Sequence, residues 1–258
     1  MRVGRSWRAF GLLFLLQGVS GCAAAPTFGE LSRMSQNMTD KMDTHGFTEI
    51  YEHVFYPLRP LPIRICEIGI SRGGSLVVWQ KYFPKSTVFG IDIYDLKQLR
   101  VVLREAGVDK DFLPSAPESP RLKTFVANQT DRAQLQQFID KYGGDFDIIM
   151  DDGGHTMEQQ QVSFAFFFKH VKPGRYYVIE DVHTSLIERY QGYGADKDGA
   201  NTTLTMISGF ISQGIIKSRY MLPEEVEYMN QNIDYCNLFS RANDAHSITC
   251  IIKKKAGE

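Results

Sequence analysis

Short apolar runs recur along this chain, and amphipathic stretches of helical period separate them. Short apolar runs bounded by turn residues predict buried strands, and apolar positions three or four apart predict helices. Strands that alternate with helices imply a parallel sheet with right-handed crossovers. The five runs cover residues 63–69, 87–92, 123–127, 146–150 and 176–179.

The stretches between the runs predict the helices of this alternation. The first helix places Leu76, Trp79 and Phe83 on one face, and Asp131 is expected to cap a helix that reaches Tyr142. The other two helices are expected over residues 95–106 and 157–170. A loop is expected over residues 112–120, and the Pro-Gly pair within residues 172–174 predicts a tight turn.

The remaining segments flank this core. Residues 27–56 have a polar, helical pattern, and a proline-bearing linker follows. Beyond residue 181 we expect a long binding loop over 182–201, and then helices over 202–213 and 223–230. Strands over 232–239 and 247–253, joined by a short connection, predict an antiparallel pair. The N-terminal helical face would consist of Leu31, Met34, Met38, Met42 and Phe47. The whole pattern predicts a seven-stranded mixed α/β sheet with helices on both faces, in which the first five strands are parallel and one C-terminal strand is antiparallel.

Composition narrows the class of protein. The chain has 258 residues, of which 43% are hydrophobic, enough for one domain with a full core. Its 29 basic and 30 acidic residues nearly balance, so no electrostatic footprint for nucleic acid is present. Three of the four cysteines lie inside predicted strands, where buried thiols are the default.

The first residues resemble a targeting segment. Arginines precede an apolar stretch, and small residues follow it up to Ala25. The segment around Cys22 resembles a lipoprotein signal, which indicates a secreted or membrane-anchored protein, whereas a misplaced start codon would leave it cytoplasmic. We therefore divide the chain into a leader (1–25), a helical segment (26–61) and a core domain (62–258). The sequence leaves open whether the chain forms a homo-oligomer.

Two adjacent carboxylates, two glycines and a histidine follow the fourth run. They lie on a strand-to-helix turn, which a parallel sheet places at its carboxyl edge, where ligands bind. One interpretation is that Asp151 or Asp152 caps the next helix. That interpretation leaves His155 unexplained, as well as a second acidic pair, Glu180 and Asp181, at the end of the fifth run. Carboxylates at two neighbouring strand ends favour a hard-cation site over helix caps alone.

A second set of residues points to a nucleotide-like ligand. The glycine-rich turn after Glu67 leads into a helix, and an acid, Asp92, ends the second run. Such turns let a ligand approach the backbone, and such an acid commonly accepts hydrogen bonds from ribose hydroxyls.

These motifs together resemble a known family. The stretch from Glu67 to Ser75, with Asp92, resembles the S-adenosylmethionine site of class I methyltransferases. The stretch from Asp151 to His155, with Glu180 and Asp181, resembles the metal-dependent macrolide sugar O-methyltransferases of the mycinamicin and demethylmacrocin type. The resemblance covers residues 62–185, and Gly154 stands where that family usually has serine. Larger members carry an additional N-terminal domain that helps to bind the substrate, which leaves the acceptor open here.

The resemblance implies a Rossmann-like class I methyltransferase fold and a role for each matched residue. It implies methylation of a hydroxyl on a sugar or polyketide-like small molecule, with S-adenosylmethionine and Mg²⁺ as cofactors. Asp152, Glu180 and Asp181 would bind the metal, and His155 would be the general base, since an imidazole can take a proton near neutral pH. The implied cofactor-binding residues are Glu67, Gly69, Ser71, Gly74, Asp92, Gln129 and Asp151.

Other functions remain as alternatives. A nicotinamide dehydrogenase would favour a second glycine where Ser71 stands. A different metal hydrolase would not need the unit from Glu67 to Asp92. The non-enzyme alternative is an exported, lipid-anchored ligand-binding protein with a degenerate methyltransferase fold. The leader is the observation that suggests this alternative.

Overall fold

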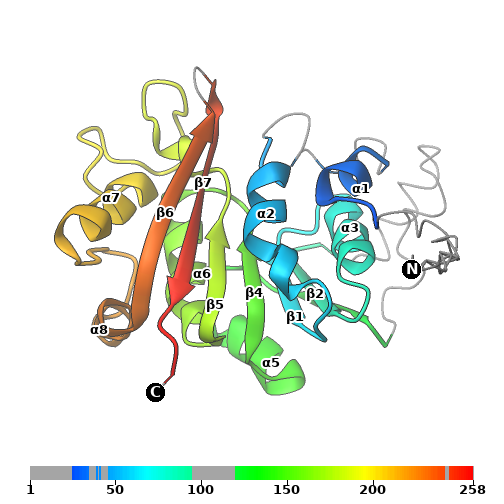
Figure 1. Cartoon of the computed structure of the whole chain (residues 1–258). Coiled ribbons are helices and arrows are strands. Elements are labelled where there is room, and N and C mark those ends of the chain that lie inside the picture. Colours follow the sequence, from blue (N-terminus) through cyan, green and yellow to red (C-terminus); the bar gives the residue numbers. More distant parts are fainter. Residues whose placement is uncertain are drawn as a thin grey trace, which may run out of the picture.

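One seven-stranded sheet organises the protein (Figure 1). The computed structural model describes residues 25–34, 39, 41, 46–94, 120–241 and 244–257, the last range without the side chains of 244–246. The strand order is β3-β2-β1-β4-β5-β7-β6. The strands are β1 (Arg64–Ile68), β2 (Thr87–Asp92), β3 (Leu122–Val126), β4 (Phe146–Asp151), β5 (Val171–Ile179), β6 (Ile233–Arg241) and β7 (Asp244–Lys254).

The predicted mixture of strand directions is confirmed. Strands β1 to β5 pair in parallel, whereas β7 is antiparallel to both β5 and β6. Four of the five apolar runs form strands that begin within one residue of the expected start, whereas β5 begins at Val171, earlier than the expected residue 176. Strands β2 and β3 are added on one side of β1, and β4 and β5 on the other. Open parallel sheets bind ligands at the point where the strand order reverses in this way.

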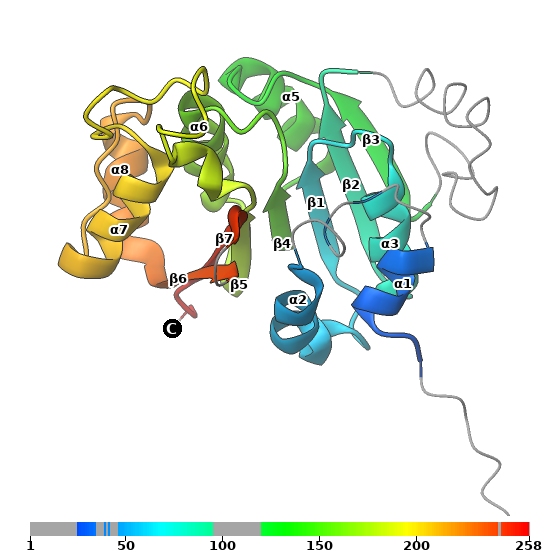
Figure 2. The same cartoon turned by 90° about the horizontal axis from the view of Figure 1, so that it is seen from above.

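Helices cover both faces of the sheet, as expected (Figure 2). On one face lie α1, α2 and α3, and on the other lie α5, α6, α7 and α8. Their bounds are α1 (Phe28–Met34), α2 (Thr48–Phe55), α3 (Gly74–Tyr82), α5 (Arg132–Tyr142), α6 (Met157–Phe168), α7 (Thr203–Gln213) and α8 (Pro223–Asn232), with short 3-10 turns at η1 (Tyr56–Leu58) and η3 (Val182–Ser185).

The core forms two apolar clusters because successive strand side chains point to opposite faces. In β4, for example, Ile149 packs among α5 and α6, whereas Ile148 and Met150 pack on the side of α3. The cluster around α3 also contains residues from α1 and α2, among them Phe28 and Tyr51. The segment 26–61 therefore shares a core with the sheet that follows it.

Local sequence explains where the helices beside the sheet begin. The Asp131 carboxylate accepts hydrogen bonds from the amides of Ala133 and Gln134, so the predicted cap of α5 is confirmed. Helix α6 begins with a capping box in which the side chains of Thr156 and Gln159 bond each other's backbone amides. The interpretation that Asp151 or Asp152 caps this helix is therefore wrong.

Two sequence predictions need correction. The helical pattern over 27–56 forms two helices, because Lys41 and Phe47 lie between them outside any helix. Leu31 and Phe47 are buried as expected, but Met34 is 55% exposed, since the helical phase is not continuous between α1 and α2. The predicted turn at 172–174 is instead a bulge inside β5, where the Gly174 amide donates to the Lys255 carbonyl.

Several predictions fall on residues that the structure does not describe. These are the leader with Cys22, the helix over 95–106, the loop from residue 112 to 119, and the side chains of Met38 and Met42. Across the described ranges, none of the helices has the length and apolar character needed to cross a membrane.

Candidate active site

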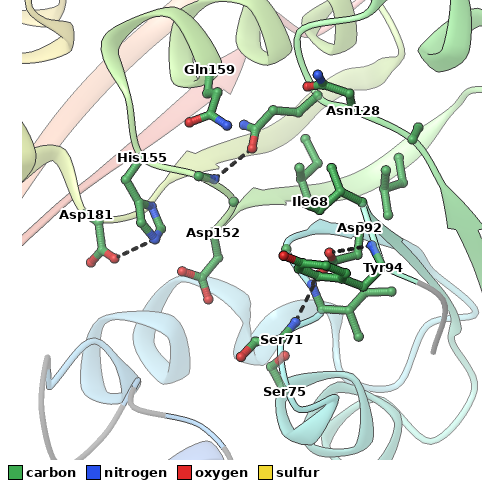
Figure 3. A pocket seen from close by; sticks show the side chains of 18 of the residues that line it. Ile68, Ser71, Ser75, Asp92, Tyr94, Asn128, Asp152, His155, Gln159 and Asp181 are labelled. Atoms are coloured by element: carbon green, nitrogen blue, oxygen red, sulfur yellow. Dashed lines mark hydrogen bonds and ion pairs between the residues drawn. The ribbon is translucent and has the colours of Figure 1, made fainter. Parts of the chain in front are cut away.

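A cavity of about 630 Å³ opens at the carboxyl ends of β1, β2, β3 and β4, beside Asp181 at the end of β5 (Figure 3). Its position at the sheet edge, where β1 has neighbours on both sides, is the one expected for a ligand site. The volume suits a ligand of cofactor size. Figure 3 shows two groups of polar side chains at this cavity, one around Asp92 and one around Asp152.

Asp92 organises the first group. Its Oδ2 accepts hydrogen bonds from the amides of Ile70 (2.7 Å) and Ser71 (3.1 Å), and its Oδ1 accepts one from the Tyr94 amide (3.0 Å). Asp92 thereby fixes the glycine-rich turn after β1. Oδ1 retains acceptor capacity towards the cavity, because a carboxylate has about four lone-pair sites.

Gly69 brings this turn close to the loop after β4. Its φ is +90°, a left-handed value that favours glycine, and a β-carbon there would collide with the Asp152 carbonyl. The Gly69 amide donates to the Ile91 carbonyl, and the Asp152 amide donates to the Ile68 carbonyl. The turn and the loop are therefore held as one unit.

Gln129 links the end of β3 to the same loop. Its Nε2 donates to Asp151 Oδ1 (3.1 Å), and its Oε1 accepts from the Gly154 amide (2.8 Å). Asp151 is buried and also accepts hydrogen bonds from the hydroxyls of Ser163 and Tyr177. Burial raises the pKa of Asp151 to about 6, against the lowering effect of its donors. Asp151 therefore supports the loop from beneath and does not line the cavity.

The second group consists of Asp152, His155 and Asp181. One ligand atom from each of these side chains lies within 4.8 Å of the others, close enough to share a metal ion. His155 Nε2 lies 3.2 Å from Asp181 Oδ2, and His155 Nδ1 is buried with no hydrogen-bond partner among the described residues. The carboxylate fixes the orientation of the imidazole ring, as acids beside functional histidines commonly do.

Backbone strain concentrates at this site. Four described residues other than glycine have positive φ, and three of them line the cavity: Ser71 (+46°), His155 (+59°) and Asp181 (+54°). Such conformations cost on the order of 1–3 kcal/mol each and persist at functional sites. Two of these strained residues, His155 and Asp181, are also the pair whose side chains lie 3.2 Å apart.

Glu180 lies apart from this group. It is buried, its Oε1 accepts a hydrogen bond from the Tyr51 hydroxyl (2.5 Å), and its Oε2 lies 2.8 Å from Lys41 Nζ. Lys41 Nζ also lies 2.6 Å from Asp152 Oδ2 and 3.2 Å from Glu67 Oε1. Burial alone would lower the pKa of Lys41, but the three carboxylates raise it well above its ordinary value, so the ammonium stays charged.

The predicted site residues thus divide into two groups. Gly69, Ser71, Asp92, Gln129, Asp152, His155 and Asp181 line the cavity. Glu67, Gly74, Asp151 and Glu180 lie behind its wall; Glu67, for example, accepts a hydrogen bond from the Ser75 hydroxyl (2.7 Å). Sequence reasoning missed Lys41 and Tyr51, because the segment that carries them shows only an amphipathic helical pattern and no motif.

The described residues fit the two ligands that the sequence suggests, Mg²⁺ and S-adenosylmethionine. Asp152 and Asp181 offer carboxylate oxygens, the donors that magnesium prefers, and leave room for further oxygen ligands on the cavity side. The turn at Ile70 and Ser71, with Asp92 behind it, offers the backbone approach and the acceptor that a nucleoside needs. Glu180 fits a metal only if its oxygen bonded to Lys41 becomes available.

No family model matches the chain, but comparison with curated proteins finds relatives of similar sequence. It is 34% identical over 209 residues to demethylmacrocin O-methyltransferase of Streptomyces fradiae, covering 78% of this chain and 45% of the relative. It is 31% identical over 202 residues to mycinamicin VI 2''-O-methyltransferase of Micromonospora griseorubida, covering 75% of this chain and 45% of the relative. The chain spans about half the length of these curated relatives.

A solved structure supports the same relationship. The MycE methyltransferase of the mycinamycin biosynthetic pathway, in complex with Mg, SAH and mycinamycin VI, superposes with a TM-score of 0.67 at 28% identity. The match covers 90% of this chain and 56% of that chain. The resemblance found in the motifs is therefore homology, and the fold is the class I methyltransferase fold.

Proposed function

We propose that this homologue of the macrolide sugar O-methyltransferases is a magnesium-dependent O-methyltransferase that uses S-adenosylmethionine. The observation that carries the proposal is the convergence of Asp152, His155 and Asp181 on one cavity with the Asp92 turn. Methyl transfer to a metal-chelated hydroxyl requires metal-binding carboxylates, here Asp152 and Asp181, a base beside them, here His155, and a nucleoside-type turn in the same cavity.

The chemistry follows from these residues. S-adenosylmethionine would supply an electrophilic methyl group, and magnesium a positive charge that favours the ionised acceptor hydroxyl. His155 would accept the hydroxyl proton, and the Asp181 carboxylate beside Nε2 would stabilise the protonated ring. The turn fixed by Asp92 would hold the nucleoside, so that the acceptor oxygen meets the methyl group in line.

The acceptor we propose is a hydroxyl of a sugar attached to a polyketide-like small molecule. The similarity to several sugar O-methyltransferases supports this class. They include an enzyme of Streptomyces olivaceus named for a rhamnosyl tetracenomycin and one of Streptomyces antibioticus named for L-olivosyl-oleandolide. The nearly balanced charge of the chain accords with a neutral small molecule and not with nucleic acid.

Calorimetry with S-adenosylhomocysteine, with and without magnesium, tests the proposal before any acceptor is known. We expect binding of both ligands to the same protein. Macrolide and rhamnosyl polyketide sugars would then be screened as acceptors, with and without a chelator. Absence of S-adenosylhomocysteine binding under both conditions would contradict the proposed methyltransferase activity. It would leave a ligand-binding protein of another kind. Full turnover in excess chelator would contradict the role of magnesium.

A further inference from the structure

One ammonium group, that of Lys41, lies among three acids, of which Asp152 lines the cavity and Glu67 and Glu180 lie behind its wall. Lys41 is fully buried, and its Nζ lies 2.6 Å from Asp152 Oδ2, 2.8 Å from Glu180 Oε2 and 3.2 Å from Glu67 Oε1. A buried charge is tolerated only when partners compensate it, and three carboxylates do so here. The converse also holds, since without the ammonium these three carboxylates would repel one another in a low-dielectric interior.

Two of these acids belong to the predicted metal set. Asp152 also lies within the group of His155 and Asp181, so one carboxylate is shared between Lys41 and the candidate metal position. Glu180 directs Oε2 to Lys41, while the Tyr51 hydroxyl holds Oε1. Lys41 thus occupies oxygen atoms that a divalent ion with all three predicted ligands would need.

A divalent ion and an ammonium cannot both stay close to the same carboxylates without strong repulsion. We propose that Lys41 is an internal counter-cation, and that magnesium must displace its ammonium from Asp152 and Glu180 in order to bind. This inference rests on the proposed magnesium dependence. Tyr51 would keep its hydrogen bond to Glu180 Oε1 during the exchange and so hold Oε2 in place for the ion.

Magnesium affinity provides the first test. Lys41→Met removes the competing charge but keeps an apolar side chain of similar length, so we expect it to bind magnesium at least tenfold more tightly than the parent in calorimetry. Lys172→Met is the matched control, because Lys172 also pairs with a buried acid, Asp147 (2.7 Å), near the start of β4, away from the cavity. The control should bind magnesium as the parent does.

The outcomes separate this inference from the function on which it rests. Tighter magnesium binding by Lys41→Met supports displacement, even if the parent binds too weakly to measure. Binding that is equal to or weaker than that of the parent overturns it, while the proposed magnesium dependence stands. If neither protein binds magnesium, with or without S-adenosylhomocysteine, both proposals fall.

A second measurement avoids the variant, because loss of a buried counter-charge destabilises a folded protein. An acylating reagent reacts with accessible amines, and Lys41 is fully buried in this arrangement. In the parent protein, saturating magnesium should therefore increase the acylation of Lys41, measured by mass spectrometry, and leave that of Lys172 unchanged. Acylation of Lys41 that magnesium does not raise would overturn the inference.

Discussion

Gly69 packs directly against the backbone carbonyl of Asp152. The contact leaves no room for a β-carbon, and it joins the turn after β1 to the loop after β4. The turn carries the amides that Asp92 fixes, and the loop carries Asp152 and His155. A direct backbone contact therefore helps to set the spacing between the candidate nucleoside and metal positions.

We expect Gly69→Ala to weaken S-adenosylhomocysteine binding at least tenfold and to lower the free energy of unfolding by about 1–3 kcal/mol, because the new methyl group must push the loop away. Gly192→Ala is the control, since Gly192 has a similar φ of +99° and open space around its β-position. The two variants can be compared by calorimetry and urea denaturation. Equal effects in both would show that backbone strain alone matters.

Asp92→Ala should weaken S-adenosylhomocysteine binding by removing both a ribose acceptor and the anchor of the turn. Loss of hydrogen bonds to a charged acceptor costs roughly 1.5–3 kcal/mol each. Asp131→Ala is a useful comparison because Asp131 caps α5 but does not line the cavity. Calorimetry should show an affinity loss for Asp92→Ala alone. Unchanged affinity would place the nucleoside elsewhere.

His155→Asn should keep cofactor affinity but reduce the methyl-transfer rate by about 10²–10⁴-fold, the usual contribution of a general base. Asparagine is the suitable replacement, since it tolerates the positive φ of this position better than alanine does. The rate would be measured with the acceptor found by screening. His53→Asn, on the exposed side of α2, should leave the rate unchanged. A fully active His155→Asn enzyme would rule out this base.

Asp181→Asn should weaken magnesium binding at least tenfold, which is about 1.4 kcal/mol. Activity should return in part at high magnesium, because the remaining ligands still form a weaker site. Asp145→Asn is the matched control, since Asp145 has the same left-handed backbone (φ +60°) and lies in the turn before β4. Magnesium titrations that do not distinguish the two variants would remove Asp181 from the metal site.

The strands, and the site residues at their ends, could be predicted because their signals are local. An apolar run such as residues 146–150 marks a buried strand wherever it occurs, and parallel topology then brings the acids after β4 and β5 to one edge. The convergence of Asp152 with Asp181 followed from this reasoning. The pairing of Glu180 with Lys41 could not be predicted in this way, because Lys41 is 139 residues away in the chain.

His170 should make the protein less stable in weak acid. Burial, together with Lys169 and Lys254, lowers the pKa of His170 to about 4, so the folded protein keeps the ring neutral. In the unfolded chain, His170 takes up a proton when the pH falls below the ordinary histidine pKa of about 6.5. The contribution to stability is therefore complete above pH 6.5 and is lost as the pH falls towards 4.

His170→Phe keeps a ring beside Phe166 but removes the titration. Urea denaturation at pH 7 and pH 5 should show a smaller loss of stability on acidification for His170→Phe than for the parent protein. His53→Asn should behave like the parent, since His53 is exposed. An identical pH dependence for His170→Phe and the parent would show that His170 titrates alike in both states.

Other errors of prediction have the same non-local origin. The bulge in β5 was expected to be a turn because a Pro-Gly pair within residues 172–174 is typical of one. The Lys255 carbonyl, which accepts from the Gly174 amide, could not be anticipated from that pair. Helix α6, in contrast, begins where its own residues Thr156 and Gln159 dictate.

The shared core of α1, α2 and α3 limits how this protein can be recombined with its relatives. A graft that exchanged the chain at residue 62 would remove Phe28, Tyr51 and Phe55 from around Trp79 and expose a large apolar surface. It would also separate Lys41 from the three acids that surround it. A chimaera that retains both features must take its crossover upstream of Phe28, so that the helical segment is inherited together with the sheet.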